Sequence, residues 1–309
     1  MSASETTLVF LGAYQGRRFL DAQIESILNQ TVPVDLWVSD DGSTDGTRER
    51  VLEYALSDSR VHLVDGPRRG FVANFASVFA RDAISEYPYL AFADQDDVWD
   101  LDKLARAQAS IGSEDAPVLY GSATRLINAR GVVVGASATR PRPLAFANAL
   151  VESFAGGNTL VLNRQAIQCV VSLRQRLGAH QDHWISHDWM LYLMMTLGGH
   201  RVVYDPEPSV GYRQHGANMI GGNRRVVARL RRAWGLFNGR FRTMVRHNVV
   251  PLQGLRAQMT PEARSCFDAY RALTESPVSL RAWYQVGLYR QHAMDQQALT
   301  LAVMLGRFP

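Results

Sequence analysis

The sequence predicts an α/β protein in which a mainly parallel sheet is flanked by helices. Short apolar runs typical of buried strands occur at residues 7–11, 36–39 and 61–64. Helical segments follow the first two of these runs, at residues 19–28 and 47–55. Because strands alternate with helices, we expect parallel strands, with ligands bound beyond their carboxyl ends.

The loops that follow the strands are therefore expected at one edge of the sheet. They comprise residues 12–16, 40–46, 66–70 and 94–97. In the second loop, Asp40 is suited to accept a hydrogen bond from a base or a ribose hydroxyl, although Asp at this position also caps helices. In the third loop, Arg68 lies in a Gly-Pro-Arg-Arg-Gly turn, where it either neutralises a diphosphate or remains solvated.

The fourth loop concentrates acidic side chains. The apolar run at residues 89–93 ends in Asp94-Gln95-Asp96-Asp97, and a Val-Trp pair follows. Carboxylates this close repel one another unless a cation lies between them. Because Mg²⁺ and Mn²⁺ take oxygen ligands, the run is predicted to hold a divalent cation together with a substrate diphosphate. The alternative is an acidic turn that caps a helix beginning near residue 101.

The middle of the chain adds more strands. They are expected at residues 118–122, 131–134, 160–162 and 201–205. The prolines at 206 and 208 are expected to end the last of them. Gly156 and Gly157 allow a ligand to approach the backbone or form a plain bulge. Asp188 opens an apolar helix at residues 190–197, a position where an acidic side chain commonly stabilises the first turn.

Composition is that of a globular protein. The 309 residues are 47% hydrophobic and 20% charged, enough for one large domain or for one domain with an appendage. No apolar run approaches the ~20 residues of a membrane span, and the first residues lack a signal-peptide pattern, so the expected compartment is the cytoplasm. Cys169 and Cys266 have no metal-type spacing and are expected to be buried free thiols.

Several motifs occur in one order along the chain. They are Ala13-Tyr14-Gln15-Gly16, Ser39-Asp40-Asp41-Gly42-Ser43-Thr44-Asp45, Asp94-Gln95-Asp96-Asp97, Gly156-Gly157-Asn158-Thr159, His187-Asp188-Trp189 and Tyr212-Arg213-Gln214-His215-Gly216-Ala217-Asn218. In this order they resemble family 2 glycosyltransferases of the GT-A fold, over about residues 6–222. The form of residues 94–99 and 212–216, and the late Gly-Leu-Tyr-Arg-Gln at 287–291, look most like the rhamnosyltransferase-type branch. Gln15 departs from the pattern, because the family usually carries Asn there.

The resemblance implies roles for individual residues. Nucleotide and donor contacts are implied for Ala13, Tyr14, Asp40, Arg68, Asp94, Trp99, Gly157 and Arg213. Asp94, Asp96 and His215 are the implied ligands of Mg²⁺ or Mn²⁺, with Asp96 as the principal one, and Asp97 supports the metal or the sugar. Asp188 matches the general base that deprotonates the acceptor hydroxyl. For Trp99, a core position at the start of a helix is an equal alternative.

The C-terminal part differs in character. We predict a catalytic domain over residues 1–222 and a helical appendage over 223–309. Within the appendage, residues 224–247 combine apolar residues at helical spacing with many arginines, which suits an anionic membrane surface on the inner face of the cytoplasmic membrane. The alternative is a helix packed on the main domain with a solvated basic face. Because the arginines flank an apolar aromatic stripe, no nucleic-acid partner is predicted.

The predicted function is inverting, metal-dependent transfer of a sugar to a hydroxyl of a cell-surface polysaccharide or its lipid-linked precursor. The resemblance makes dTDP-L-rhamnose the expected donor. A UDP-hexose-dependent family 2 transferase is one alternative, and a non-catalytic module that binds nucleotide-sugars or glycans is another. The sequence assigns no acceptor, linkage position, preferred metal or oligomeric state.

Overall fold

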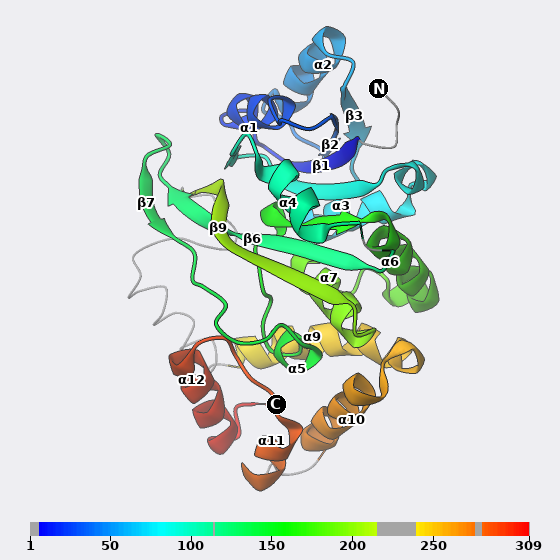
Figure 1. Ribbon diagram of the computed structural model, residues 1–309, viewed down its shortest axis with the longest axis vertical. Coiled ribbons are helices and arrows are strands. Elements are labelled where there is room, and N and C mark those ends of the chain that lie inside the picture. Colours follow the sequence, from blue (N-terminus) through cyan, green and yellow to red (C-terminus); the bar gives the residue numbers. More distant parts are fainter. Residues whose placement is uncertain (1–5, 114, 215–238, 276–279, 309) are drawn as a thin grey trace.

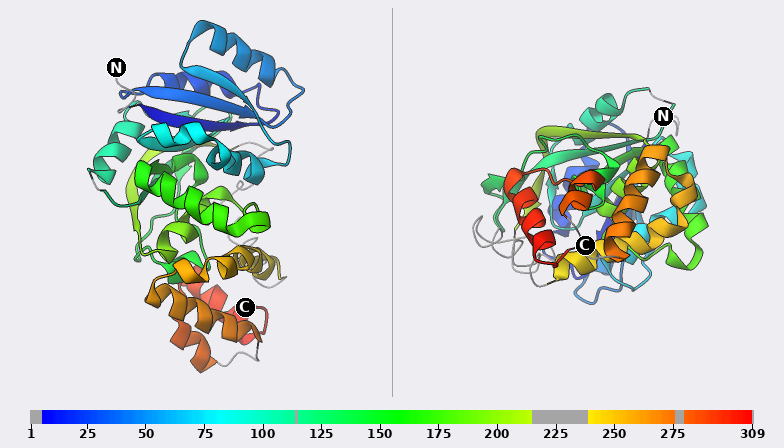
Figure 2. Two further views of the ribbon diagram at one scale, coloured as in Figure 1. Left: turned by 90° about the vertical axis from the view of Figure 1, so that its right-hand side faces the viewer. Right: turned by 90° about the horizontal axis from the view of Figure 1, so that it is seen from below.

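The computed structural model describes residues 6–113, 115–214, 239–275 and 280–308. The molecule is elongated, with the first strands toward one end and the C-terminal helices toward the other, as Figure 1 and the left view of Figure 2 show.

A single mixed sheet runs through the described part of the chain, in the order β3-β2-β1-β4-β8-β6-β9-β5, with β7 paired to β6. Its first four strands are parallel, as predicted. They are β1 (Thr7–Ala13), β2 (Val34–Asp40), β3 (Val61–Asp65) and β4 (Tyr89–Asp94). The remaining strands are β5 (Val98–Trp99), β6 (Val118–Ile127), β7 (Val133–Ala136), β8 (Val161–Asn163) and β9 (Arg201–Arg213). Because β8 lies antiparallel between β4 and β6, the sheet is mixed at its centre.

Helices cover both faces of the sheet (Figure 1). One face carries α1 (Leu20–Leu28), α2 (Thr47–Ser57) and α4 (Lys103–Ile111). The other carries α3 (Phe71–Ala76), α5 (Phe146–Ala149), α6 (Arg164–Leu177) and α7 (His187–Leu197). Short 3-10 turns are η1 (Ser77–Ala80), η2 (Asp82–Glu86), η3 (Gly157–Thr159), η4 (Gly178–His180) and η5 (Arg256–Gln258). The α/β class with parallel strands and flanking helices is therefore confirmed.

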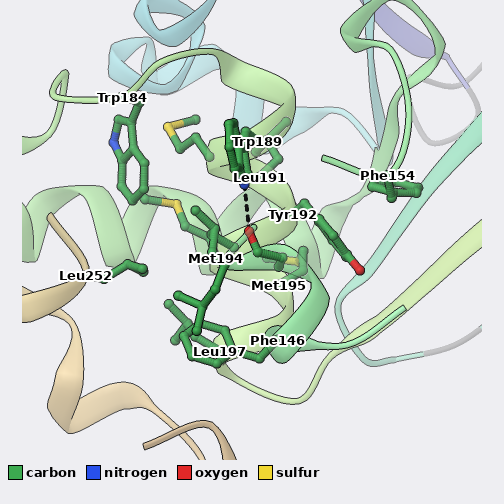
Figure 3. Packing of buried hydrophobic residues seen from close by; sticks show 14 of the residues in the cluster. Phe146, Phe154, Trp184, Trp189, Leu191, Tyr192, Met194, Met195, Leu197 and Leu252 are labelled. Atoms are coloured by element: carbon green, nitrogen blue, oxygen red, sulfur yellow. Dashed lines mark hydrogen bonds between the residues drawn. The ribbon is translucent and has the colours of Figure 1, made fainter. Parts of the chain in front are cut away.

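Alternating strand residues divide the interior into two cores, because successive side chains point to opposite faces. What we call the first core contains Val9 and Leu11 of β1 and lies under α1, α2 and α4. The second core contains Leu8 and Phe10 of the same strand and lies under α3, α6 and α7. Figure 3 shows its centre, where the Trp189 indole donates a hydrogen bond to the Ala149 carbonyl at 2.6 Å.

The C-terminal helices pack into the second core. They are α9 (Arg240–Gly254), α10 (Pro261–Glu275), α11 (Leu280–Val286) and α12 (Ala293–Met304). Phe267, Trp283 and Phe308 belong to the same buried cluster as Phe10. A helical C-terminal region is thus present as predicted, and it shares its core with the sheet; the proposed boundary at 222/223 lies outside the described residues.

Two sequence predictions need correction here. Strand β9 continues past Pro206 and Pro208 to Arg213, because its pairing with β6 jumps from Asp205 to Val210 and the prolines fall in the resulting bulge, where no ladder hydrogen bond is required.

The second correction concerns the basic segment. Its described part belongs to α9, where Val245 is buried and Phe241 and Met244 pack against the second core. For residues 240–247 the packing alternative is therefore right, and residues 224–238 lie outside the described residues.

No helix within the described ranges is long and apolar enough to cross a bilayer. Cys169 and Cys266 are free thiols, as predicted, and both are half-buried.

Candidate active site

The acidic run occupies the turn between β4 and β5. Asp94 and Asp96 are half-buried, whereas the Asp97 carboxylate is fully buried. Asp97 accepts hydrogen bonds from the Arg213 backbone N–H at 3.0 Å and from the Asn158 side-chain amide. Asp97 therefore ties the end of β4 to the end of β9 and to the glycine loop, which is a structural role.

Asp188 joins this acidic turn from a distant part of the chain. Burial, followed by the charges of Asp96 and Asp188, raises the pKa of Asp94 to about 7. Burial is the largest cause of this shift, and the charges of the two other carboxylates add to it. That Asp94, Asp96 and Asp188 form one site stays a prediction.

Carboxylate oxygens are suitable ligands for a hard divalent cation. Among the described residues, however, no group of three or more His, Cys, Asp or Glu side chains is arranged to hold a metal ion. Proteins typically coordinate Mg²⁺ through one or two carboxylates, and substrate phosphates complete the coordination shell. Asp94 and Asp96 could thus hold such an ion. The third predicted ligand, His215, lies outside the described residues.

Asp188 lies in the first turn of α7. The Ser153 hydroxyl donates a hydrogen bond of 2.7 Å to Asp188 Oδ2, which fixes the orientation of the carboxylate. The carboxylate is half-buried and its neighbours Asp94 and Asp96 are acidic. A half-buried carboxylate with one oriented oxygen is suited to accept a proton.

The glycine loop supports α7. His187 is buried, and its ring stacks on that of Phe75 with centroids 4.1 Å apart, so burial lowers the pKa of the imidazole. A Cβ at Gly157 would lie 2.2 Å from His187 Nε2. Gly157 was predicted to contact the donor; in the structure its missing side chain makes room for His187.

The loop after β1 presents a ring to solvent. Ala13 is buried and its carbonyl accepts the Asp41 N–H at 2.8 Å, while Tyr14 is 57% exposed. Gln15 adopts a positive φ of 52° and its side-chain amide donates to Thr44 Oγ1 at 3.0 Å. This position, where the family usually carries Asn, therefore links the β1 loop to the β2 loop.

The loops after β2 and β3 are organised by two aspartates. The buried Asp40 carboxylate accepts the Ser43 N–H at 3.2 Å and lies 3.9 Å from Arg48. Asp41 accepts the N–H groups of Arg68 at 2.6 Å and Gly70 at 2.8 Å. The Arg68 side chain is exposed at the same edge, as the sequence analysis expected.

The side chains of Trp99 and Arg213 are both buried within the protein. Trp99 is 3% exposed within the first core, with Lys103 Nζ 3.7 Å from its ring centroid, so the core alternative is the one that fits. The buried Arg213 guanidinium donates to the carbonyls of Asp96, Asn128 and Ala129 at 2.7–3.3 Å. These hydrogen bonds brace the acidic turn.

Lys103 itself is unusual. It is the single lysine of the chain, whose other 32 basic residues are arginines. Its side chain is fully buried, Nζ has no hydrogen-bond partner among the residues that the structure describes, and burial lowers its pKa to about 7.

Sequence reasoning missed several side chains that shape the site. Asp41, Gln95, Ser153 and Asn158 each make a hydrogen bond to another part of it. Asp41, Gln95 and Asn158 lie inside motifs, which was an available signal, but their partners are distant in sequence. Ser153 carries no local signal.

Solved structures establish the fold class. The chain is similar to a mannosyltransferase from Pyrobaculum calidifontis solved with GDP-Man and Mn²⁺, at 17% identity and a TM-score of 0.51, covering 98% of this chain and 87% of that one. It is also similar to S. aureus TarS 1–349 solved with UDP-GlcNAc, at 15% identity and a TM-score of 0.52, covering 91% and 79%. The protein therefore has the GT-A glycosyltransferase fold.

The family follows from sequence. Residues 9–157, just under half of the chain, match the family model described as Glycosyl transferase family 2, and this part of the chain is a glycosyltransferase domain of that family. It is similar to the dTDP-rhamnosyl transferase RfbG of Shigella flexneri, with 27% identity over 72% of this chain and 77% of that protein. It is also similar to the UDP-Glc:alpha-D-GlcNAc-diphosphoundecaprenol beta-1,3-glucosyltransferase WfgD of Escherichia coli, with 29% identity over 50% and 59%.

Proposed function

We propose that this glycosyltransferase moves a sugar from a nucleoside diphosphate to an acceptor hydroxyl with inversion, in a metal-dependent reaction. The observation that supports the proposal is that the charges of Asp96 and Asp188 both act on the buried carboxyl group of Asp94. Two of these carboxylates come from a strand end that suits a diphosphate-bound cation. The third comes from a helix start and suits proton acceptance.

In the proposed reaction, the acceptor oxygen bonds to the anomeric carbon while the bond from that carbon to the diphosphate oxygen breaks. The diphosphate leaves with the electron pair, and Asp188 accepts the hydroxyl proton. Because attack and departure occur on opposite sides of the carbon, the configuration inverts. The hydrogen bond from Ser153 keeps Asp188 oriented during this step.

Asp94 and Asp96 would hold Mg²⁺ or Mn²⁺, with His215 as a proposed third ligand. The bound ion would stabilise the negative charge that develops on the leaving diphosphate. Burial is the largest cause of the raised pKa of Asp94, and the charges of Asp96 and Asp188 add a repulsion that a cation would offset. The mannosyltransferase of similar fold was solved with Mn²⁺.

The nucleoside is assigned to the loops after β1 and β2. The exposed Tyr14 ring is available for contact with a base, the Ala13 backbone borders it, and Asp40 is proposed to face the ribose. Arg68 lies exposed at the same edge and is proposed to approach the diphosphate. Trp99, Gly157 and Arg213 are not part of this proposed contact set.

The proposed donor is dTDP-L-rhamnose, since RfbG is named a dTDP-rhamnosyl transferase. A UDP-hexose is the second candidate, because WfgD is named for UDP-Glc and TarS was solved with UDP-GlcNAc. The name of WfgD also includes a diphosphoundecaprenol acceptor. A hydroxyl of a cell-surface polysaccharide or of its lipid-linked precursor is therefore the proposed acceptor. We further propose that residues 224–238 bring the enzyme to the inner face of the cytoplasmic membrane.

The test combines binding and turnover. Thermal unfolding with a panel of nucleotides and nucleotide-sugars, each with and without Mn²⁺, should show protection that depends on the metal and selects dTDP or UDP forms. Asp188→Asn should retain this protection while transfer falls about 10²–10⁴-fold. The matched control is Asp82→Asn, which removes an exposed carboxylate of η2 and should change neither.

Three outcomes would each overturn part of the proposal. If no nucleotide protects a folded sample, the donor site is wrong. If Asp188→Asn leaves transfer unchanged, the base is wrong, and if the wild type binds nucleotide-sugars without any transfer, the non-catalytic binding module becomes the better account.

A further inference from the structure

Gln95 lies between the two proposed metal-binding carboxylates but directs its side chain elsewhere. Its Oε1 accepts the Tyr14 N–H at 2.8 Å, and its Nε2 donates to the Tyr14 carbonyl at 2.9 Å. One primary amide thus occupies both hydrogen-bonding groups of a single residue 81 positions away. The contact joins the β1 loop to the acidic turn in the manner of a strand pair.

Gly16 provides the space for this contact. A Cβ at position 16 would lie 2.0 Å from Gln95 Oε1, and the three nearest atoms to it all belong to the Gln95 side chain. The backbone of Gly16 does not adopt a positive φ, so an alanine would be tolerated there apart from this clash. An alanine at position 16 would therefore have to displace the Gln95 side chain from this contact.

The opposite side of the same loop is attached to the β2 loop. The N–H of Gln15 donates to Ser43 Oγ at 3.0 Å, and the N–H of Gly16 donates to Thr47 Oγ1 at 2.9 Å. The β1 loop is consequently held between two neighbours. Gln95 provides two side-chain hydrogen bonds from the acidic turn to this loop.

We propose that Gln95 is a positioning residue that sets the spacing between the nucleoside site and the metal site and couples binding at the two. The inference rests on the proposed function. Asp94 and Asp96 are the covalent neighbours of Gln95, so a movement of the Tyr14 backbone is transmitted to both carboxylates. A base that orders Tyr14 therefore orders the metal ligands, and bound metal orders Tyr14 in return.

The first experiment separates this route from direct contact between metal and phosphate. Thymidine and uridine carry no phosphate, so any effect of Mn²⁺ on their binding must pass through the protein. In the full-length wild type, Mn²⁺ should tighten nucleoside binding, measured by calorimetry, by about fivefold or more, and the nucleoside should tighten Mn²⁺ binding by the same factor. In Gln95→Leu this factor should fall close to one.

The second experiment is a double-mutant cycle on dTDP and UDP affinity in the presence of Mn²⁺. Gly16→Ala and Gln95→Ala should each weaken binding about tenfold, a typical coupling magnitude. In the Gln95→Ala background, Gly16→Ala should cost almost nothing, because the atoms that it meets are gone. Such a rescue is not expected from two unrelated structural defects.

Gln95→Glu serves as the conservative variant, since a carboxylate keeps the acceptor for the Tyr14 N–H and loses the donor to its carbonyl. It should retain part of the coupling. Additive effects of Gly16→Ala and Gln95→Ala, or nucleoside–Mn²⁺ coupling unchanged in Gln95→Leu, would overturn the inference while leaving the proposed function intact. A wild type that binds no nucleotide would overturn both.

Discussion

The two cores of this protein differ in how much of the chain they need. The first core, under α1, α2 and α4, draws its buried residues from between Val9 and Val210. The second core begins at Leu8 and extends to Phe308, so it is incomplete without the C-terminal helices. The nucleoside-side loops are therefore supported locally, whereas the helix that carries Asp188 depends on the end of the chain.

The link between the chain end and Asp188 is specific. The Asn148 side-chain amide donates a hydrogen bond to the Tyr289 carbonyl at 2.9 Å. The Glu152 carboxylate accepts a hydrogen bond from the Gln291 N–H at 2.7 Å. The next residue after Glu152 is Ser153, whose hydroxyl holds Asp188. The late Gly-Leu-Tyr-Arg-Gln motif thus supports the segment that orients the proposed base.

The largest effect should come from Trp283→Ala, which tests whether the two cores unfold together. Trp283 is 1% exposed and packs edge-on against Phe308 with ring centroids 5.9 Å apart. The cavity should lower the free energy of unfolding by about 3–5 kcal/mol. Urea unfolding followed by fluorescence and by nucleotide protection should give two separate transitions, and one shared transition would contradict the independent support of the two regions. Tyr284→Ala, at a side chain 64% exposed on the same helix, is the control.

The first core should respond to pH through Lys103. Its pKa is lowered from 10.5 to about 7, so between these values the unfolded chain binds a proton that the folded chain has lost. Stability should therefore rise with pH across that window by about 1.4 kcal/mol per unit, and the full penalty applies below pH 7. Lys103→Met should remove this slope in urea unfolding between pH 7 and 10. Lys103→Arg should destabilise throughout, because a guanidinium stays charged; a slope unchanged in Lys103→Met would refute the assignment.

Asp41→Asn should affect the nucleoside side alone. An amide cannot accept the N–H groups of both Arg68 and Gly70, so the β3 loop should loosen at a cost of about 2–3 kcal/mol. We expect weaker nucleotide protection and unchanged His187 packing, the latter read from its NMR signals. If nucleotide protection and the packing of His187 were disturbed to the same extent, the nucleoside-side loops and the Asp188 helix would not be independent. Asp45→Asn, in the same motif but bonded elsewhere, is the comparison variant.

Gln291→Leu should have the smallest effect on the free energy of unfolding. It should act on the region around Asp188 and leave the nucleoside-side loops unchanged. Gln291 is 1% exposed, donates to Asn148 Oδ1 at 3.1 Å and accepts the Arg142 N–H at 2.9 Å. Losing these bonds should cost about 1–2 kcal/mol. Transfer should slow while nucleotide affinity stays constant, and Gln297→Leu, on an exposed position of α12, should change neither. A fall in nucleotide affinity would show that the chain end also supports the nucleoside-side loops.

The nucleoside side was also the part best predicted from sequence. Strands β1 to β4 and the loops that follow them are local patterns, because buried parallel strands read as apolar runs and turns carry Gly and Asp. That Asp94, Asp96 and Asp188 form one site, as the motif order implies, stays a prediction.

The remaining features depend on packing between distant segments. Whether Trp99 faced a ligand or the core was decided by α1 and α4, and the space at Gly157 was decided by His187. The passage of β9 through two prolines required a bulge against β6 that no local pattern announces. The helices α9 to α12 were expected as helices, but nothing in their own residues indicated where they would dock.

The lone buried lysine gives this protein a built-in reporter of opening. Amine-reactive reagents applied to the folded chain should find no accessible ε-amino group, since Lys103 is fully buried and is the single lysine of the sequence. Acylation at position 103, followed by mass spectrometry of the peptide that contains it, therefore counts the molecules in which the first core has opened. Pulse labelling would then report the opening rate of this one core at a single, chemically unambiguous position.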